Sequence, residues 1–241
     1  MLLKDGDVHV WQVRVDALGQ DLVTCTLPQS EIERAEKFAF PHLSLRWRCG
    51  RMALRQILGL YLHTLPREIS FGAGVRGKPF VIGPDGAPSK LEFNMSDAGD
   101  HVVVAVASGR SIGVDVEQLR DIEEMADIVE RNFSELERRR YRSLPPEQKK
   151  PAFFAAWTRK EAYTKAVGLG LYLPLDSFSV SMAPDEPASL IEVDGSPSKA
   201  AGWTLSDIAV PAGHFGALVV RGRISKIETR TWNDATPLYP L

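Results

Sequence analysis

Cysteine is scarce in this chain, and the residues present follow no disulfide or ligand pattern. Only Cys25 and Cys49 occur, and neither belongs to a CxxC or CxxH motif. We therefore expect neither a disulfide framework nor a zinc site. The five histidines show no metal-ligand spacing, and the sequence holds neither a GxSxG nucleophile motif nor a Walker A phosphate loop.

Long apolar runs and an excess of charge of one sign are also missing. The opening MLLKDGDVHV lacks the apolar segment of a secretory signal, and no run approaches the roughly 20 residues of a membrane span. We therefore expect a cytoplasmic protein with no membrane partner. Lys and Arg number 29 against 31 Asp and Glu, so no strongly basic face for nucleic acid is expected.

The chain has enough apolar material for a core of its own. It has 241 residues, of which 44% are apolar, which suits one large domain or two small ones. The order strand, helices, strands occurs twice along the chain. This order predicts an α+β fold of two halves with a similar plan, residues 1–110 and 111–241.

Helix-end signals divide the helical regions. Two capping boxes are predicted, Ser30 with Glu33 and Ser134 with Glu137. Residues 44–63 carry an apolar stripe of helical spacing. A further helix is predicted to begin at Pro151 and to stop at Gly168, because proline suits the first helical position and glycine the end.

Strand signals gather in the middle of the chain. The segment KLEFNMSDAGDHVVVAVA predicts strand, turn and strand, with the turn at residues 96–99. The strand of RSIGVDVEQL follows closely, so we expect an antiparallel meander. The glycine-rich residues 71–80 predict a loop, in which Lys78 is extended because Pro79 follows it.

RSIGVDVEQL places two carboxylates on one face of a mostly apolar strand. Asp115 and Glu117 are two residues apart and so point to the same side, while Val114 and Val116 point to the other. One interpretation is an edge strand with a solvated face. The other is a magnesium site, because hard divalent cations prefer carboxylate oxygens.

Glu161 is the candidate for a third carboxylate. It precedes Lys165 by four residues, which also fits an exposed helical ion pair. Its helix is rich in aromatic residues, so we expect the helix to be packed and its charged face to line a cleft. Five basic residues are candidates for phosphate binding, although each alone also fits a solvated surface: Arg34, Arg51, Arg55, Arg76 and Lys78.

Several motifs occur together in a characteristic order. IGVDVE is followed by FFAAWTRKEAYTKAVGLGL, which contains W-x-x-K-E-x-x-x-K at Trp157, Lys160, Glu161 and Lys165. GKPF and FNMSDAGD precede this pair, and LPLDSFSV follows it. In this order the sequence resembles the Sfp-type phosphopantetheinyl transferases, over roughly residues 31–180.

The resemblance implies a fold and a reaction. The fold would be two similar α/β halves related by a pseudo-twofold axis in one chain, which we expect to be a monomer. The reaction would be Mg²⁺-dependent. It would move the phosphopantetheine arm of coenzyme A onto a serine of an acyl or peptidyl carrier protein of secondary metabolism, releasing adenosine 3′,5′-bisphosphate.

The resemblance also implies roles for individual residues. Mg²⁺ would be held by Asp115, Glu117 and Glu161, with Glu161 also the candidate general base and Lys165 stabilising charge on the phosphates. The implied contacts to coenzyme A are Arg34, Arg76, Lys78, Ser96, Asp97, Lys160 and Lys165. Arg51 and Arg55 are added on electrostatic grounds alone.

One residue departs from the family pattern. The third motif usually ends Asn-x-Ser-His, with the histidine on phosphate, whereas this chain has Asp97 there. Three outcomes are open: other cations act instead, His101 folds back, or Asp97 contacts a hydroxyl of the ribose or the carrier. The departure also supports an alternative function, a non-catalytic paralogue that binds coenzyme A or carrier proteins. A metal-dependent pyrophosphate hydrolase would keep the carboxylates but does not explain the order of motifs.

Overall fold

The structure is a computed structural model that describes residues 1–15, 26–183 and 186–232. Cys25 lies outside the described residues. The elements of the first half are β1 (Asp7–Arg14), α2 (Gln29–Glu36), α3 (Pro41–Leu62), η2 (Pro66–Glu68), β2 (Phe71–Ala73), β3 (Pro79–Val81), β4 (Leu91–Ala98) and β5 (His101–Ser108).

The second half begins directly after β5. Its elements are β6 (Ile112–Gln118), α4 (Met125–Asn132), α5 (Glu135–Ser143), α6 (Pro146–Val167), η3 (Gly170–Tyr172), η4 (Leu175–Ser177), β7 (Phe178–Val180), β8 (Leu190–Val193), α7 (Pro197–Ala200), β9 (Trp203–Asp207), β10 (His214–Arg221) and β11 (Lys226–Trp232). None of the helices in these described ranges is long and apolar enough to cross a membrane.

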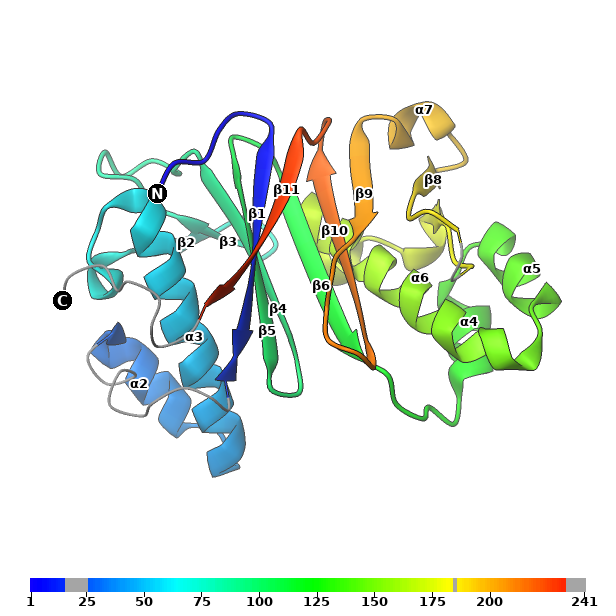
Figure 1. Cartoon of the computed structure of the whole chain (residues 1–241), viewed down its shortest axis with the longest axis horizontal. Helices are drawn as coiled ribbons and strands as arrows, with labels where there is room; N and C mark the ends of the chain where they lie inside the picture. Colours follow the sequence, from blue (N-terminus) through cyan, green and yellow to red (C-terminus); the bar gives the residue numbers. More distant parts are fainter. Residues whose placement is uncertain (16–25, 184–185, 233–241) are drawn as a thin grey trace.

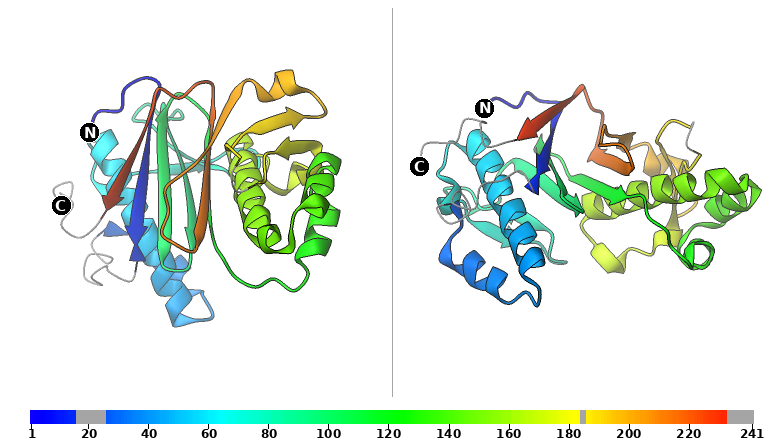
Figure 2. Two further views of the ribbon diagram at one scale, coloured as in Figure 1. Left: turned by 45° about the vertical axis from the view of Figure 1, so that its right-hand side comes forward. Right: turned by 60° about the horizontal axis from the view of Figure 1, so that its bottom comes forward.

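Each half is built around one main sheet and one long helix. The first sheet has the strand order β11-β1-β5-β4, and the second has the order β6-β10-β9. The 22-residue helix α3 lies on the outer side of the first sheet, and the 22-residue helix α6 lies on the outer side of the second (Figures 1 and 2). The α+β class and the doubled plan predicted from the sequence are confirmed.

Strand alternation builds three layers of core. On β5, Val102, Val104 and Val106 pack in the cluster under α3, whereas the intervening Val103 and Ala105 pack in a cluster shared with β6 and β10. Successive side chains of a strand point to opposite faces, so β5 is buried on both. The two sheets therefore pack face to face, and each outer face is covered by its helix.

β11 does not belong to the sheet of its own half. It pairs in parallel with β1, with Asp7 opposite Lys226. β11, which the predicted division at residues 110 and 111 assigns to the second half, therefore completes the sheet of the first half. Hydrogen bonding between distant strands is not encoded by any local pattern in either segment.

The predicted meander and turn are partly wrong. β4 and β5 form the expected antiparallel pair, but β6 pairs with β10 and not with β5. β4 also continues through Ser96 and Asp97 to Ala98, so the turn lies at Gly99, whose φ of +59° suits glycine. The glycine-rich residues 71–80 include a short hairpin, in which β2 pairs with β3.

Two of the four predicted helix-end signals are confirmed. Ser134 and Glu137 form a complete capping box on α5, and Gly168 ends α6 in the left-handed conformation, with φ of 78°. The Ser30 box is wrong, because α2 begins at Gln29, which places Ser30 inside the helix, and its N-cap Pro28 has no side-chain cap. Pro151 lies inside α6, because Pro146 already takes the first helical turn.

Candidate active site

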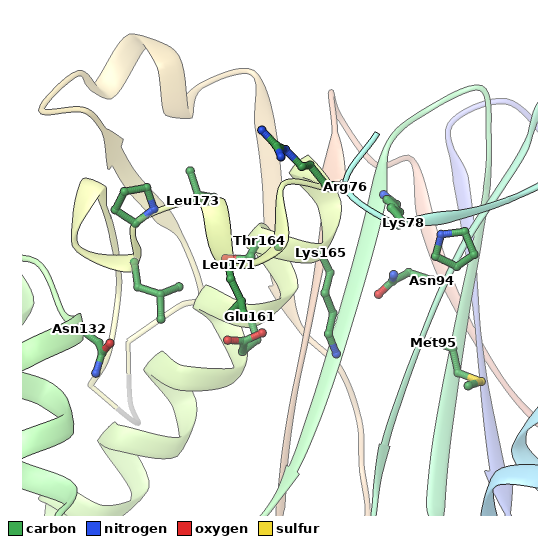
Figure 3. Close-up of a pocket in the computed structure, with 16 residues that line it drawn as sticks. Arg76, Lys78, Asn94, Met95, Asn132, Glu161, Thr164, Lys165, Leu171 and Leu173 are labelled. Carbon is green, nitrogen blue, oxygen red and sulfur yellow. The ribbon is translucent and has the colours of Figure 1, made fainter. Parts of the chain in front are cut away.

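A cleft of about 540 Å³ opens between the two halves. One wall comes from the β2–β3 hairpin and β4, and the other comes from α6 and the residues that follow it (Figure 3). Glu161 and Lys165 of α6 lie in this cleft together with Lys78 and Asn94 of the first half. The cleft has the volume usual for a small-molecule site.

Gly113 sets the distance between β6 and α6. A Cβ atom at this position would lie 2.1 Å from the Ala162 carbonyl oxygen and 2.4 Å from the Ala166 nitrogen. Only glycine therefore allows the helix backbone to approach the strand this closely. Asp115, two residues further on the same strand face, is thereby brought within reach of Lys165.

A polar cluster crosses the seam between the halves at Asp115. Lys165 Nζ donates to Asp115 Oδ1 at 2.7 Å, and Ser96 Oγ of β4 donates to the same oxygen at 2.8 Å. Lys165 also donates to Ser96 Oγ at 2.9 Å. Asn94 Oδ1, also on β4, accepts from the Val114 N–H at 2.9 Å. Asn94 and Ser96 of the first half thus both bond β6 of the second half.

Asp115 and Glu161 are carboxyl groups whose burial disfavours their negative charge. Asp115 is 4% exposed, and its Oδ2 has no hydrogen-bond partner within the described part of the chain. Burial raises the pKa of Asp115, and Lys165 opposes this effect. Burial also raises the pKa of Glu161, with the charge of Asp115 as the next cause. A divalent cation between them would relieve both effects.

Glu117 is turned to a different partner. Its Oε2 accepts from Arg120 Nη1 at 2.8 Å, near the surface. Within residues 1–15, 26–183 and 186–232, no three His, Cys, Asp or Glu side chains are close enough to hold a metal ion. The oxygen donors fit Mg²⁺ chemistry, but Glu117 must leave Arg120 before it can join Asp115 and Glu161.

Besides Lys165, the predicted coenzyme A contacts Lys78 and Arg76 line the cleft. Lys78 Nζ donates to the carbonyl oxygens of Ile112 at 2.8 Å and Ala166 at 3.1 Å, so it links the two halves. Burial lowers the pKa of Lys78. Arg76 lies over the ring of Tyr172, 3.7 Å from its centroid. Together with Lys165 they make one end of the cleft cationic.

Lys160 does not reach the cleft. Its side chain is fully buried, and Nζ donates to Glu137 at 2.7 and 2.8 Å and to the Phe178 carbonyl oxygen at 2.8 Å. The family resemblance implied a coenzyme A contact for Lys160, which directly precedes Glu161 in the motif. Consecutive residues of a helix point in different directions, however, so the two side chains lie in different surroundings. The expected contact to coenzyme A therefore needs a correction: Lys160 is held in the interior of the second half, on Glu137 and Phe178.

The other predicted arginines also lie elsewhere. Arg51 and Arg55 both bond Glu31 of α2, with Arg55 Nε 2.8 Å from Glu31 Oε2. Both arginines thus form ion pairs that join α3 to α2 in the first half. Arg34 is exposed and stacks over Trp47 at 5.4 Å, and it is not among the residues that line the cleft.

Asp97 is paired with an arginine that the sequence analysis missed. Arg46 Nη2 lies 3.2 Å from Asp97 Oδ2. Both residues line a cavity of about 240 Å³, which shares Met95 with the main cleft. His101 packs instead on the ring of His214, with centroids 4.7 Å apart. A neighbouring cation therefore compensates the charge at position 97. No spacing signal marks Arg46, because the contact joins α3 to β4.

Comparison with known proteins shows to which protein family the chain belongs. A family model described as the 4′-phosphopantetheinyl transferase superfamily matches residues 111–213, and one described as 4′-phosphopantetheinyl transferase, N-terminal, matches residues 11–109. The 4′-phosphopantetheinyl transferase HetI of Nostoc sp. is 37% identical over 224 residues, 92% of this chain and 91% of its own. The chain belongs to the 4′-phosphopantetheinyl transferases.

A second curated relative agrees with this assignment. A 4′-phosphopantetheinyl transferase of Bacillus subtilis is 32% identical over 177 residues, 73% of this chain and 75% of its own. Among solved structures, the holo-[acyl-carrier-protein] synthase of Thermotoga maritima matches with a TM-score of 0.35 and 21% identity, over 47% of this chain and 63% of that one. The predicted family and enzyme class are confirmed: the chain transfers phosphopantetheine to carrier proteins.

Proposed function

We propose that this transferase moves the phosphopantetheine arm of coenzyme A to a serine of an acyl or peptidyl carrier protein in a Mg²⁺-dependent reaction. The observation that carries the proposal is the Asp115 cluster: Asp115 is buried with Oδ2 unpaired, and its Oδ1 accepts from Lys165, which lines the cleft together with Glu161. The serine oxygen forms a bond to the phosphorus that bears pantetheine, and the bridging P–O bond breaks. Adenosine 3′,5′-bisphosphate leaves with the electron pair.

Asp115, Glu117 and Glu161 would hold the metal ion. Bound there, Mg²⁺ would neutralise the pyrophosphate and polarise the phosphorus under attack. The unpaired Asp115 Oδ2 supports this assignment from the described residues themselves. Arg120, which pairs with Glu117 at 2.8 Å, lies outside the lining of the cleft and would be released.

Glu161 is the proposed general base. Burial raises its pKa, which makes its carboxylate a stronger proton acceptor for the carrier serine. Lys165 would stabilise the charge that develops on the leaving phosphate. Its ammonium bonds Ser96 and Asp115, and the residue lines the cleft in which the phosphates would lie.

The rest of coenzyme A is assigned to the cationic end of the cleft. Arg76 and Lys78 of the cleft and Ser96 of the Asp115 cluster would contact its phosphates, with Asp97 and Arg46 further along β4 and α3. We propose that the transferase acts as a monomer in the cytoplasm, where coenzyme A and carrier proteins meet. The non-catalytic alternative rested on Asp97, and its pairing with Arg46 removes the unopposed charge that supported it.

The test is a mass measurement on carrier proteins. The transferase is incubated with coenzyme A, Mg²⁺ and apo acyl or peptidyl carriers, and the mass of each carrier is followed. A gain of one phosphopantetheine on the carrier is expected, and a chelator should abolish it. Asp115→Asn should lower the rate by about 100-fold or more, whereas Asp121→Asn, at an exposed carboxylate, serves as the matched control. The absence of a gain on every carrier would overturn the proposal.

A further inference from the structure

Thr164 carries a buried hydroxyl that the catalytic assignment does not use. It lies one turn after Glu161 on α6 and lines the same cleft. Its side chain is 6% exposed, and Oγ1 has no hydrogen-bond partner within the described residues. Leaving a buried hydroxyl unpaired is costly, so the position is better explained by a ligand group than by packing.

Thr158 on the same helix shows the usual alternative. Its Oγ1 donates to the Phe154 carbonyl oxygen at 3.0 Å, within its own helix. Threonine in a helix normally satisfies its hydroxyl in this way. Thr164 does not, although two χ1 rotamers are open to a helical threonine and the residue lines the cleft. The unpaired state is therefore a property of this position and not of the residue type.

A second polar side chain lies at the far end of the cleft. Asn132, the last residue of α4, lines the cleft beside Leu173 and Leu175. Its Nδ2 donates to the Ile128 carbonyl oxygen at 3.0 Å, which fixes the amide. Figure 3 shows Asn132 and Lys78 on opposite sides of the cleft, with Glu161 between them. One end of the cleft is thus cationic, and the other is apolar with a fixed amide.

The two ends match the two parts of coenzyme A on either side of the reacting phosphorus. The nucleotide and pyrophosphate carry the negative charge and belong with Lys78, Arg76 and Lys165. The pantetheine arm is uncharged and extended, with two methyl groups, one hydroxyl and two secondary amides. It must therefore run from Glu161 towards the apolar end, where polar partners for its hydroxyl and amides are few.

We propose that Thr164 and Asn132 are specificity-determining residues that bind the polar groups of the pantetheine arm. Thr164 Oγ1 pairs with the hydroxyl or the amide nearest the phosphate, and Asn132 Oδ1 accepts from the N–H of an amide further along. Leucine side chains between them contact the apolar part of the arm. This inference rests on the proposed function, because it takes coenzyme A as the ligand.

The experiment compares a ligand that has the arm with one that lacks it. Binding of coenzyme A and of adenosine 3′,5′-bisphosphate to the full chain is measured by calorimetry with Mg²⁺ and without carrier. Thr164→Val replaces only the hydroxyl, with a methyl group of similar size, and should weaken coenzyme A binding by roughly 2- to 10-fold. Binding of adenosine 3′,5′-bisphosphate should not change. The melting temperature should stay the same or rise, because a buried unpaired hydroxyl is lost.

Two further variants complete the design. Thr158→Val, on the same helix, is the matched control and should leave both affinities unchanged. Asn132→Leu should weaken coenzyme A selectively, like Thr164→Val. Equal weakening of both ligands, or of neither, by Thr164→Val would overturn the inference. The carrier assay on the unmodified transferase separates the two proposals: no transfer refutes the proposed function, whereas transfer with an unchanged coenzyme A affinity in Thr164→Val refutes only this inference.

Discussion

Glu161, the proposed general base, lies where burial disfavours its charged form. Burial and the charge of Asp115 raise its pKa above the ordinary 4.5. The folded chain thus keeps this proton to a higher pH than the unfolded chain does. The free energy of unfolding therefore falls as the pH rises from 4.5 through the raised folded value.

Glu161→Gln should separate stability from activity. The amide stays neutral, so the variant should melt at a higher temperature than the unmodified chain at about pH 8 and at the same temperature near about pH 4. Transfer should fall by about 10²- to 10⁴-fold. Thermal melts across pH and the carrier assay measure both. Glu147→Gln, at an exposed site of the same helix, is the control. A melting temperature that falls at high pH would contradict the argument.

Asp97→His should retain transfer. The Arg46–Asp97 pair lies near the surface, with side chains 33% and 57% exposed, so its loss should cost at most about 1 kcal/mol. Histidine also restores the residue type usual in the family at this position. Thermal melts and the carrier assay measure the two effects. A loss of transfer as large as that of Asp115→Ala would show that Asp97 has an active role of its own.

At the scale of elements, one buried ion pair joins α5, α6 and β7. Glu137 accepts from Lys160 of α6, from the Ser134 N–H at its own helix start, and from the Val180 N–H of β7. Both charged side chains are fully buried. The pair thus fixes α6, and with it Glu161, relative to the rest of the second half.

Lys160→Met should therefore destabilise the chain strongly. It leaves the Glu137 carboxylate buried without a cation, which costs about 3–5 kcal/mol. Chemical denaturation measures the change, and Lys150→Met, at a partly exposed lysine paired with Asp121, is the control with little expected effect. Calorimetry on the folded fraction should find an unchanged coenzyme A affinity. A stable variant that fails to bind coenzyme A would instead support a direct contact.

The close contact between β6 and α6 depends on the absence of a Cβ atom at Gly113. Gly113→Ala would place that atom 2.1 Å from a helix carbonyl oxygen, so strand and helix must separate. Transfer and stability should both fall, because Asp115 and Lys165 lie on the two elements that move apart. Gly50→Ala in α3 is the matched control: its Cβ would lie 3.6 Å from Val102 Cγ2, an ordinary contact, and alanine favours the helix. Equal behaviour of the two variants would refute the close-approach argument.

At the scale of the whole molecule, the sequence predicted what is encoded locally. The capping box at Ser134, the stop at Gly168 and the doubled order of elements follow from neighbouring residues. The motif residues Asp115, Glu161 and Lys165 are brought together as expected, because their two elements are each well marked. The domain boundary at residue 110 and the roles of individual site residues remain predictions.

Contacts between distant segments were beyond the reach of sequence patterns. Lys160 looks exposed in a charged motif, but Glu137 comes from another helix. Arg46 meets Asp97 across α3 and β4, and nothing in the local spacing of either residue indicates it. Thr164 is similar: its hydroxyl is unusual only because no partner in the described fold reaches it. Such features depend on tertiary packing, which local periodicity does not specify.

The parallel pairing of β1 with β11 has a consequence for synthesis of the transferase. Asp7 lies opposite Lys226, so β1 is paired on one edge by a strand that is made much later. Contacts of such high sequence separation form late, because the loop between them must close first. During translation β1 has its β11 edge unpaired until residues 226–232 have left the ribosome. The four-stranded sheet that contains β4, and with it Ser96 of the Asp115 cluster, is therefore completed only once β11 has been made.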